Sequence, residues 1–144
     1  MKVAEVMSSP VVVMRPTEPV AHAKNLMLRH DIKRLVVMEH GNPVGIVSMK
    51  DLAEHLGRGT SAWRRRPIDR IPIARVMNTN LVTASPGTDV EKAANMLLQH
   101  GISSLIITEG KQLVGILTKT DLARSFAEKL GGRAKVRELM SKNV

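Results

Sequence analysis

The sequence predicts an α/β (α+β) fold built from two repeated units, each in the order strand–helix–strand–strand–helix. Three observations predict this fold. Sliding the chain by seventy residues aligns residues 3–56 with residues 73–126 without a gap, and nineteen of the fifty-four aligned pairs are identical. Strand-like and helix-like patterns occur at matching places in both copies. A unit of about 55 residues is too small to be comfortably stable alone, so we expect the two units to pack through their apolar sheet faces.

The strands are predicted from short runs of β-branched and aliphatic residues. They cover residues 11–14, 35–38 and 44–47 in the first copy and residues 81–84, 105–108 and 114–117 in the second. A proline follows the first strand of each copy after one further residue, which favours an end to the strand there. Short polar turns separate the second and third strands, so these two strands are expected to form a hairpin.

The first helix of each copy is predicted from its apolar spacing. In the first copy, one helical stripe is formed by Val20, Ala23, Leu26 and Met27. In the second copy, Thr88 and Glu91 predict a capping box at the start of the helix, and Gly101 predicts its end. His30 and His100 recur near the ends of these helices, where a cation suits the helix dipole.

A phrase that begins at a glycine is repeated at the end of the third strand. It reads GIVSMKDL at residues 45–52 and GILTKTDL at residues 115–122. The hydroxyl residue followed three positions later by aspartate fits a capping box, so the phrase could serve only to start a helix. A helix start also offers free N–H groups for a phosphate, while an aspartate can accept hydrogen bonds from a ribose diol. The two interpretations are compatible, and the glycine would permit a close approach of ligand or backbone.

Composition limits the classes of function. The chain has a net charge of +9, which favours anionic partners, and it has no cysteine for disulfide or thiolate chemistry. One Trp, one Phe and no Tyr argue against a stacking platform for single-stranded nucleic acid. We find no transmembrane run, clustered metal-ligand spacing or catalytic signature, so we expect a cytoplasmic protein without catalytic or metal-binding residues.

The regions outside the repeats leave alternatives open. We expect unit 1 at residues 1–60, a basic linker at residues 61–72, unit 2 at residues 73–130 and a tail at residues 131–144. The tail is either a short amphipathic helix or the start of a further unit, because VRELM at residues 136–140 echoes the openings of both copies. The cluster WRRRPIDR at residues 63–70 offers a rival function, a basic module for binding nucleic acid or protein.

The repeated order of elements, the VM at residues 6–7 and 76–77, and the paired phrase resemble CBS (cystathionine-β-synthase) domains, two of which form a Bateman module. The resemblance spans nearly residues 1–126. It implies pseudo-twofold packing of the two sheets and a non-catalytic regulatory module with two clefts. Adenine nucleotides (AMP foremost, ADP or ATP) are the expected ligands, with an S-adenosylmethionine-type ligand or a ligand-free scaffold as alternatives. It also implies a homodimer forming a four-unit disc and an unidentified protein target.

Carried over to this chain, the resemblance implies that each cleft combines the phrase of one unit with strand residues of the other. Asp121 would hold the ribose, the two threonines and the basic pair the phosphate, and apolar residues the base. The main cleft would comprise Val11, Val12, Ile32, Lys33, Arg34, Leu35, Thr118, Thr120 and Asp121.

The second cleft is expected to be weaker or to suit a less charged ligand, because serines replace the basic pair there. It would comprise Ser48, Lys50, Asp51, Leu81, Val82, Ile102, Ser103 and Ser104.

Overall fold

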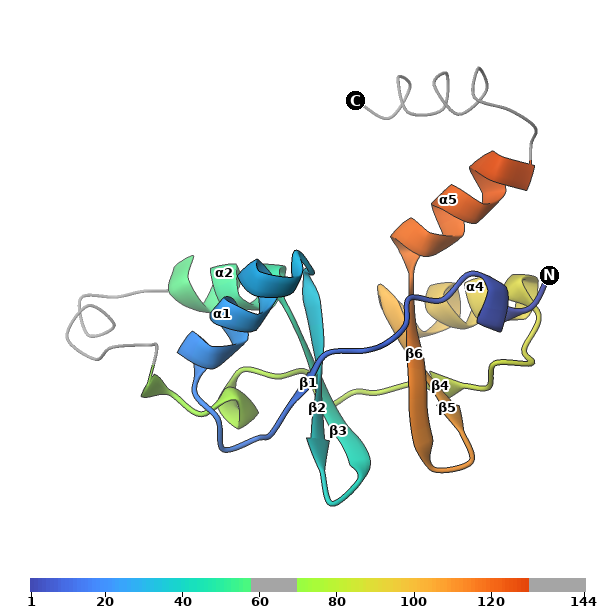
Figure 1. Ribbon diagram of the computed structural model, residues 1–144. Helices are drawn as coiled ribbons and strands as arrows, with labels where there is room; N and C mark the ends of the chain where they lie inside the picture. The colour runs from blue at the N-terminus through green and yellow to red at the C-terminus, as the bar shows by residue number, and fades with distance from the viewer. Residues whose placement is uncertain (58–69, 130–144) are drawn as a thin grey trace. The chain divides into compact units, whose positions relative to one another are not determined.

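The computed structural model describes residues 1–57 and 70–129, and these residues form two three-stranded sheets with flanking helices (Figure 1). The α+β fold class predicted from the sequence is confirmed. The elements of the first repeat are η1 (Val3–Glu5), β1 (Val13–Met14), α1 (Val20–His30), β2 (Arg34–Glu39), β3 (Asn42–Ser48) and α2 (Met49–Gly57). Those of the second are η3 (Ile73–Arg75), β4 (Thr83–Ala84), α4 (Val90–His100), β5 (Ser104–Glu109), β6 (Gln112–Thr118) and α5 (Lys119–Lys129).

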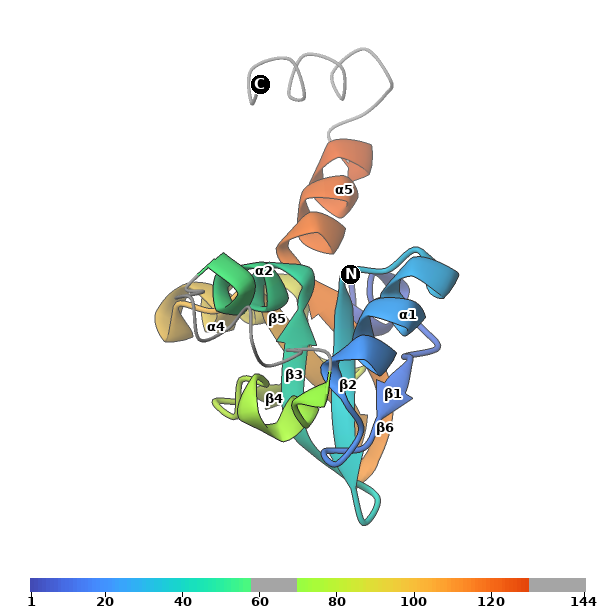
Figure 2. The same ribbon diagram turned by 90° about the vertical axis from the view of Figure 1, so that its left-hand side faces the viewer.

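The two sheets have the same strand order, β1–β2–β3 and β4–β5–β6. In the first sheet β1 runs parallel to β2, and β2 runs antiparallel to β3 after a tight turn; Figure 2 gives a clear view of this sheet. The pairs Val13–Val36 and Thr83–Ile106 set the same register in both sheets. The first strands are shorter than predicted, because only two residues of each run pair with the neighbouring strand.

The first helices bury the predicted stripe. Val20, Ala23 and Met27 are almost wholly buried on α1, and α4 buries residues at the equivalent positions. The predicted end of α4 is confirmed, because Gly101 caps the helix in the left-handed conformation with φ 60°. Asp31 takes the same conformation at the end of α1, with φ 51°.

The predicted capping box of α4 is wrong. The helix begins at Val90 with Asp89 as its N-cap, and no side-chain hydrogen bond caps it. Thr88 therefore lies one residue outside the cap position. Its hydroxyl instead pairs with Ser85, 3.0 Å from the Ser85 Oγ, in the turn that precedes the helix.

The compact units differ from the sequence repeats in which opening segment each contains. The first opening segment (residues 1–10) belongs with β4, α4, β5, most of β6 and α5, in what we call the β4–β6 unit. The second opening segment (residues 71–80) belongs with β1–β3, α1 and α2, in the β1–β3 unit, which also includes Lys111–Leu113. Each repeat therefore gives its opening segment to the unit formed by the other repeat.

Equivalent backbone hydrogen bonds hold the two opening segments. In the β4–β6 unit, the Val3 N–H donates to the Thr88 carbonyl at 2.9 Å, and Ser8 forms a two-way bridge with Ile116. In the β1–β3 unit, the Ile73 N–H donates to the Glu18 carbonyl at 2.8 Å. Ile73 and Glu18 are the counterparts of Val3 and Thr88 in the seventy-residue repeat. Asn78 forms the matching bridge with a β3 residue.

The opening segments also complete the two cores. Ile73 and Val3 are fully buried, each within the hydrophobic cluster of the other repeat. Burying such a side chain contributes about 1.5–3 kcal/mol relative to exposing it. The strands carry further apolar residues of opposite parity, such as Val36 and Ile106, whose side chains point to the second face of each sheet. Packing of the sheets through those faces stays a prediction.

The glycine of each repeated phrase makes room for a methionine of an opening segment. A Cβ atom at Gly115 would overlap the Met7 side chain and would lie 3.2 Å from the Ser8 carbonyl oxygen. A Cβ atom at Gly45 would overlap the Met77 side chain. The close approach inferred from the sequence is therefore made by the protein's own chain.

We predict that Gly115→Ala lowers the free energy of unfolding by about 1–3 kcal/mol, because the added methyl group displaces Met7 and presses on the Ser8 backbone. Urea denaturation of the full chain measures this change. Gly87→Ala is the matched control, because a Cβ atom there meets nothing within 4 Å, and its effect should stay within about 0.5 kcal/mol. Equal midpoints for the two variants would contradict the packing role of Gly115.

Candidate ligand-binding site

The two repeated phrases form the same local structure at the starts of α2 and α5. In the first, the Ser48 N–H donates to the Asp51 carboxylate at 2.9 Å, and the Asp51 N–H donates to the Ser48 hydroxyl at 3.0 Å. In the second, Thr118 and Asp121 make the same reciprocal pair at 3.0 and 3.1 Å. The predicted capping boxes are present, and each holds its carboxylate in one orientation.

Capping leaves part of each carboxylate free for a ligand. An ionised carboxylate can accept about four hydrogen bonds, and the capping box uses one of these positions. Lys50 and Thr120, inside the first turns of α2 and α5, are exposed, whereas Thr118 and Asp121 are buried. Helix starts of this kind can hold a phosphate on their N–H groups while the carboxylate accepts from hydroxyl groups.

Ser8 is a site residue that the sequence analysis missed. Its hydroxyl donates to the Asp121 carboxylate, 3.2 Å from Oδ1 and 3.4 Å from Oδ2. The equivalent residue, Asn78, uses its side-chain oxygen to accept from the Asn80 N–H at 2.9 Å. The sequence signal was the position of Ser8 directly after the repeated VM, but only the exchange of opening segments brings it to Asp121.

The basic pair Lys33–Arg34 lies beside the phrase of its own unit. Arg34 pairs with Ser48 across β2 and β3, and the Lys33 carbonyl accepts from the Met49 N–H at 2.8 Å. In the β4–β6 unit, the Ser103 carbonyl accepts from the N–H of the first α5 residue at 3.1 Å. The backbone that enters β2 beside the α2 start therefore carries two cationic residues, where the backbone that enters β5 beside the α5 start carries two serines.

The remaining predicted residues line the first strands and the entrances to the second strands. Val12 and Ile32 pack on the core of the β1–β3 unit, as Val82 and Ile102 do on that of the β4–β6 unit. Leu35 is fully buried, which leaves only its backbone for a ligand. Val11 and Leu81 are half-buried next to their strands.

Each predicted cleft combines residues from both compact units. Val11, Val12, Ile32, Lys33, Arg34 and Leu35 belong to the β1–β3 unit, whereas Thr118, Thr120 and Asp121 belong to the β4–β6 unit. The second cleft likewise draws Ser48, Lys50, Asp51 and Leu81 from one unit and Val82, Ile102, Ser103 and Ser104 from the other. The composite clefts stay predictions.

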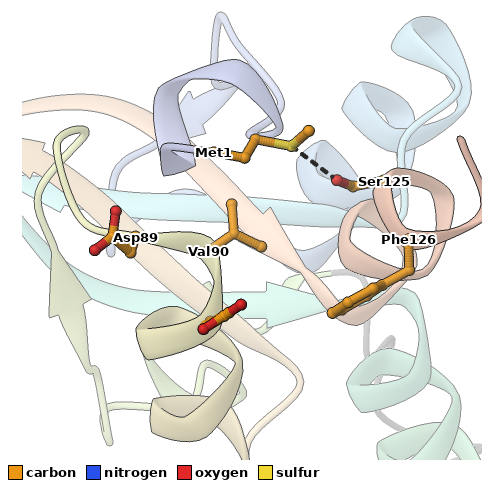
Figure 3. A pocket seen from close by; sticks show the side chains of 6 residues that line it. Met1, Asp89, Val90, Ser125 and Phe126 are labelled. Atoms are coloured by element: carbon orange, nitrogen blue, oxygen red, sulfur yellow. Dashed lines mark hydrogen bonds between the residues drawn. The ribbon is translucent and has the colours of Figure 1, made fainter. Parts of the chain in front are cut away.

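A separate hollow of about 230 Å³ lies within the β4–β6 unit, between the first opening segment, the start of α4 and the middle of α5 (Figure 3). It is lined by Met1, Asp89, Val90, Glu91, Ser125 and Phe126. The Lys2 ammonium hydrogen-bonds Asp89 at 2.7 Å and lowers the pKa of that carboxyl. The contact therefore persists above the usual carboxyl pKa and is lost when acid brings the pH down through the lowered value.

Two sequence-based interpretations concern segments that lie wholly or mostly outside the described residues. Residues 63–69 of the basic cluster and the tail at residues 131–144 lie outside the described residues. Within residues 1–57 and 70–129, no group of three or more His, Cys, Asp and Glu side chains could hold a metal ion. No helix in these same ranges is long and apolar enough to span a membrane.

Two equivalent capped helix starts, each following the third strand of a three-stranded sheet, define a tandem α+β module with two copies of the same candidate site. The family model of the CBS domain matches residues 3–58 and 73–128. The chain therefore belongs to the CBS domain family, as its resemblance indicated, and it carries two CBS domains. CBS domain pairs are generally regulatory and non-catalytic.

Known proteins show the same pairing of domains. The chain is 31% identical over 121 residues to the CBS domain-containing protein YhcV of Bacillus subtilis (strain 168), covering 84% of this chain and 82% of that protein. The crystal structure of the CBS domain pair of protein MJ0100, in complex with 5′-methylthioadenosine and S-adenosyl-L-methionine, matches with a TM-score of 0.76 and 25% identity. That match covers 90% of this chain and 98% of the MJ0100 pair.

Other relatives are much longer than this chain. The match to the A-adding tRNA nucleotidyltransferase of Geobacter sulfurreducens has 25% identity and spans 84% of this chain, but only 13% of that enzyme. The similarity therefore concerns the CBS pair and does not extend to the rest of such proteins.

Proposed function

We propose that this chain is a cytoplasmic sensor that binds an adenine nucleotide, AMP foremost, and passes the occupancy to a protein target or an attached domain. The observation that carries this proposal is the pair of carboxylates, Asp51 and Asp121, each oriented by a capping box at a helix start. Family membership supports it, because a homologous CBS pair holds two adenosine-containing ligands.

In the proposed site, different protein groups contact the ribose, the phosphate and the base of the nucleotide. The carboxylate accepts hydrogen bonds from the ribose diol, and the hydroxyl and N–H groups of the same helix start contact the phosphate. Aliphatic side chains such as Val12 and Ile32 enclose the base, and backbone near Val12 reads its edge. A ligand that prefers one arrangement of the two halves over another shifts the balance between them, which is the physical basis of the switch.

The charge around each phrase should decide ligand preference. The sequence-based assignment gave Lys33 and Arg34 to the Asp121 cleft. An alternative is supported by backbone contacts with the Asp51 phrase, since Arg34 pairs with Ser48 and the Lys33 carbonyl accepts from the Met49 N–H. We propose that the pair serves the Asp51 site, because Arg34 is opposite Ser48 in the same sheet. The Asp121 site, with Ser103 and Ser104 at the entrance to β5 beside it, then suits a less charged ligand.

An S-adenosylmethionine-type ligand is the second candidate. The observation that favours it is the MJ0100 pair, which binds S-adenosyl-L-methionine and 5′-methylthioadenosine. Both ligands contain an adenosine with a ribose diol and lack the phosphate groups that a basic pair would contact. The phrase with serines beside it is therefore the better candidate for this class of ligand.

We predict that AMP binds the wild-type chain and that Asp51→Asn and Asp121→Asn each weaken one site at least tenfold. Asparagine keeps an oxygen for the capping N–H, so loss of binding reports on the ligand contact. Isothermal calorimetry with AMP, ATP and S-adenosylmethionine measures the affinities. Glu54→Gln, an exposed change on α2, is the control. Absence of binding for all three ligands, or unchanged affinity in both asparagine variants, would refute the site.

A second prediction concerns the basic pair. Replacing Lys33 and Arg34 together with alanine should weaken AMP binding about tenfold or more at the Asp51 site, because charge-assisted bonds to phosphate are lost. The Asp121→Asn background isolates this site, and Asp51→Asn isolates the other for comparison. Calorimetry at fixed salt measures both. Weakening confined to the Asp121 site would instead support the assignment made from the sequence.

We also propose that the chain forms a homodimer, as implied by its family resemblance. Leu28 and Leu98, at equivalent positions of α1 and α4, are 76% and 73% exposed, and such apolar side chains suit an interface. Sedimentation velocity at micromolar concentration should give a dimer mass for the wild type. Leu28→Glu with Leu98→Glu should shift it toward the monomer. A wild-type monomer under these conditions would contradict the proposal.

A further inference from the structure

The hydroxyl of Ser8 lies close to both oxygens of the Asp121 carboxylate. It is 3.2 Å from Oδ1 and 3.4 Å from Oδ2, so it is nearly equidistant from the two oxygens. The capping N–H of Thr118 contacts Oδ2 at 3.0 Å. The Ser8 hydroxyl thus stands where a ligand must approach if it is to contact both oxygens.

A vicinal diol binds a carboxylate through both oxygens, because each of its two hydroxyls donates to one oxygen. The Ser8 hydroxyl and the diol therefore require the same acceptor positions. We propose that Ser8 is a built-in competitor, which covers the Asp121 carboxylate until a ribose displaces its hydroxyl. This inference rests on the proposed function, since it requires that Asp121 bind a ribose.

The two sites differ in this respect. Asn78, the counterpart of Ser8, directs its side-chain oxygen to the Asn80 N–H, and within the described residues no hydrogen bond joins it to Asp51. The competitor therefore belongs to the Asp121 site alone. It gives the two sites different affinities for the same sugar even where the phrases are alike.

The rest of the first opening segment stays anchored when the hydroxyl turns away. Backbone bonds join Ser8 to Ile116 in both directions at 2.9 and 3.1 Å, and Val3 remains in the core. The Ser125 hydroxyl, one turn beyond Asp121 on α5, donates to the Met1 sulfur at 3.1 Å. Displacement should therefore be local to the Ser8 side chain, without release of the opening segment.

The test is the AMP affinity of Ser8→Ala in the Asp51→Asn background, which isolates the Asp121 site. We expect AMP to bind about three- to tenfold more tightly than it does with Ser8 present, because the competing hydrogen bond is absent. Ser8→Thr keeps the hydroxyl and should keep the original affinity. Asn78→Ala in the Asp121→Asn background should leave affinity at the Asp51 site within about twofold.

A diol-free nucleotide provides the matched ligand control. For 2′,3′-dideoxyadenosine 5′-monophosphate, the presence or absence of the Ser8 hydroxyl should make no difference of more than about twofold, because no diol competes with it. Equal or weaker AMP binding by Ser8→Ala overturns the competition while leaving the proposed function intact. Failure of AMP to bind with or without Ser8, at the Asp51 site as well, overturns the proposed function and the competition with it.

Discussion

The exchange of opening segments is the interaction on which the rest of the structure depends. Val3 and Ile73 are both fully buried, and each fills the core of the unit formed by the other repeat. A repeat of this size buries too small a fraction of its surface to be comfortably stable, so a missing aliphatic side chain matters. The same exchange explains why both phrases need glycine, since Met7 and Met77 occupy the space of a side chain.

The exchange also determines what surrounds the candidate carboxylates. Asp51 and Asp121 are oriented by local capping boxes, which depend only on the phrase itself. Their further neighbours differ in origin: Lys33 and Arg34, at the entrance to β2, lie beside the phrase of the same repeat, whereas the exchanged opening segment supplies Ser8 to Asp121. The two candidate carboxylates are therefore capped in the same way but differ in the residues beside them, a basic pair next to one phrase and the Ser8 hydroxyl next to the other.

Local patterns predicted the elements well, because strands and helices depend on spacing that a sequence displays directly. The stripe of α1, the end of α4 at Gly101 and both capping boxes of the phrases were predicted correctly. The capping box at Thr88 was wrong because the helix begins one residue later than the pattern implied. A threonine near a helix start has several acceptors and donors within reach, and the sequence does not rank them.

Contacts between residues that are far apart in the sequence could not be predicted. Ser8 and Asp121 are separated by 113 positions, and no periodicity links them. The hairpin of β2 and β3 was predicted, but the sequence did not give the register that pairs Arg34 with Ser48. That register is needed to propose which phrase has the basic pair beside it. The purpose of the repeated glycine was also ambiguous, because a ligand and a methionine impose the same need for space.

The boundaries of the two compact units differ from those of the sequence repeats, and this difference bears on which single copy could close its own core. The piece of sequence that was duplicated is out of phase with the piece that closes a core, since residues 1–10 complete the β4–β6 unit. A single copy that began at residue 11 would carry its own closing segment after its second helix, because the β1–β3 unit is formed almost entirely by the continuous stretch 11–81. The β4–β6 unit instead takes its closing segment, residues 1–10, from a part of the chain that precedes the whole β1–β3 unit.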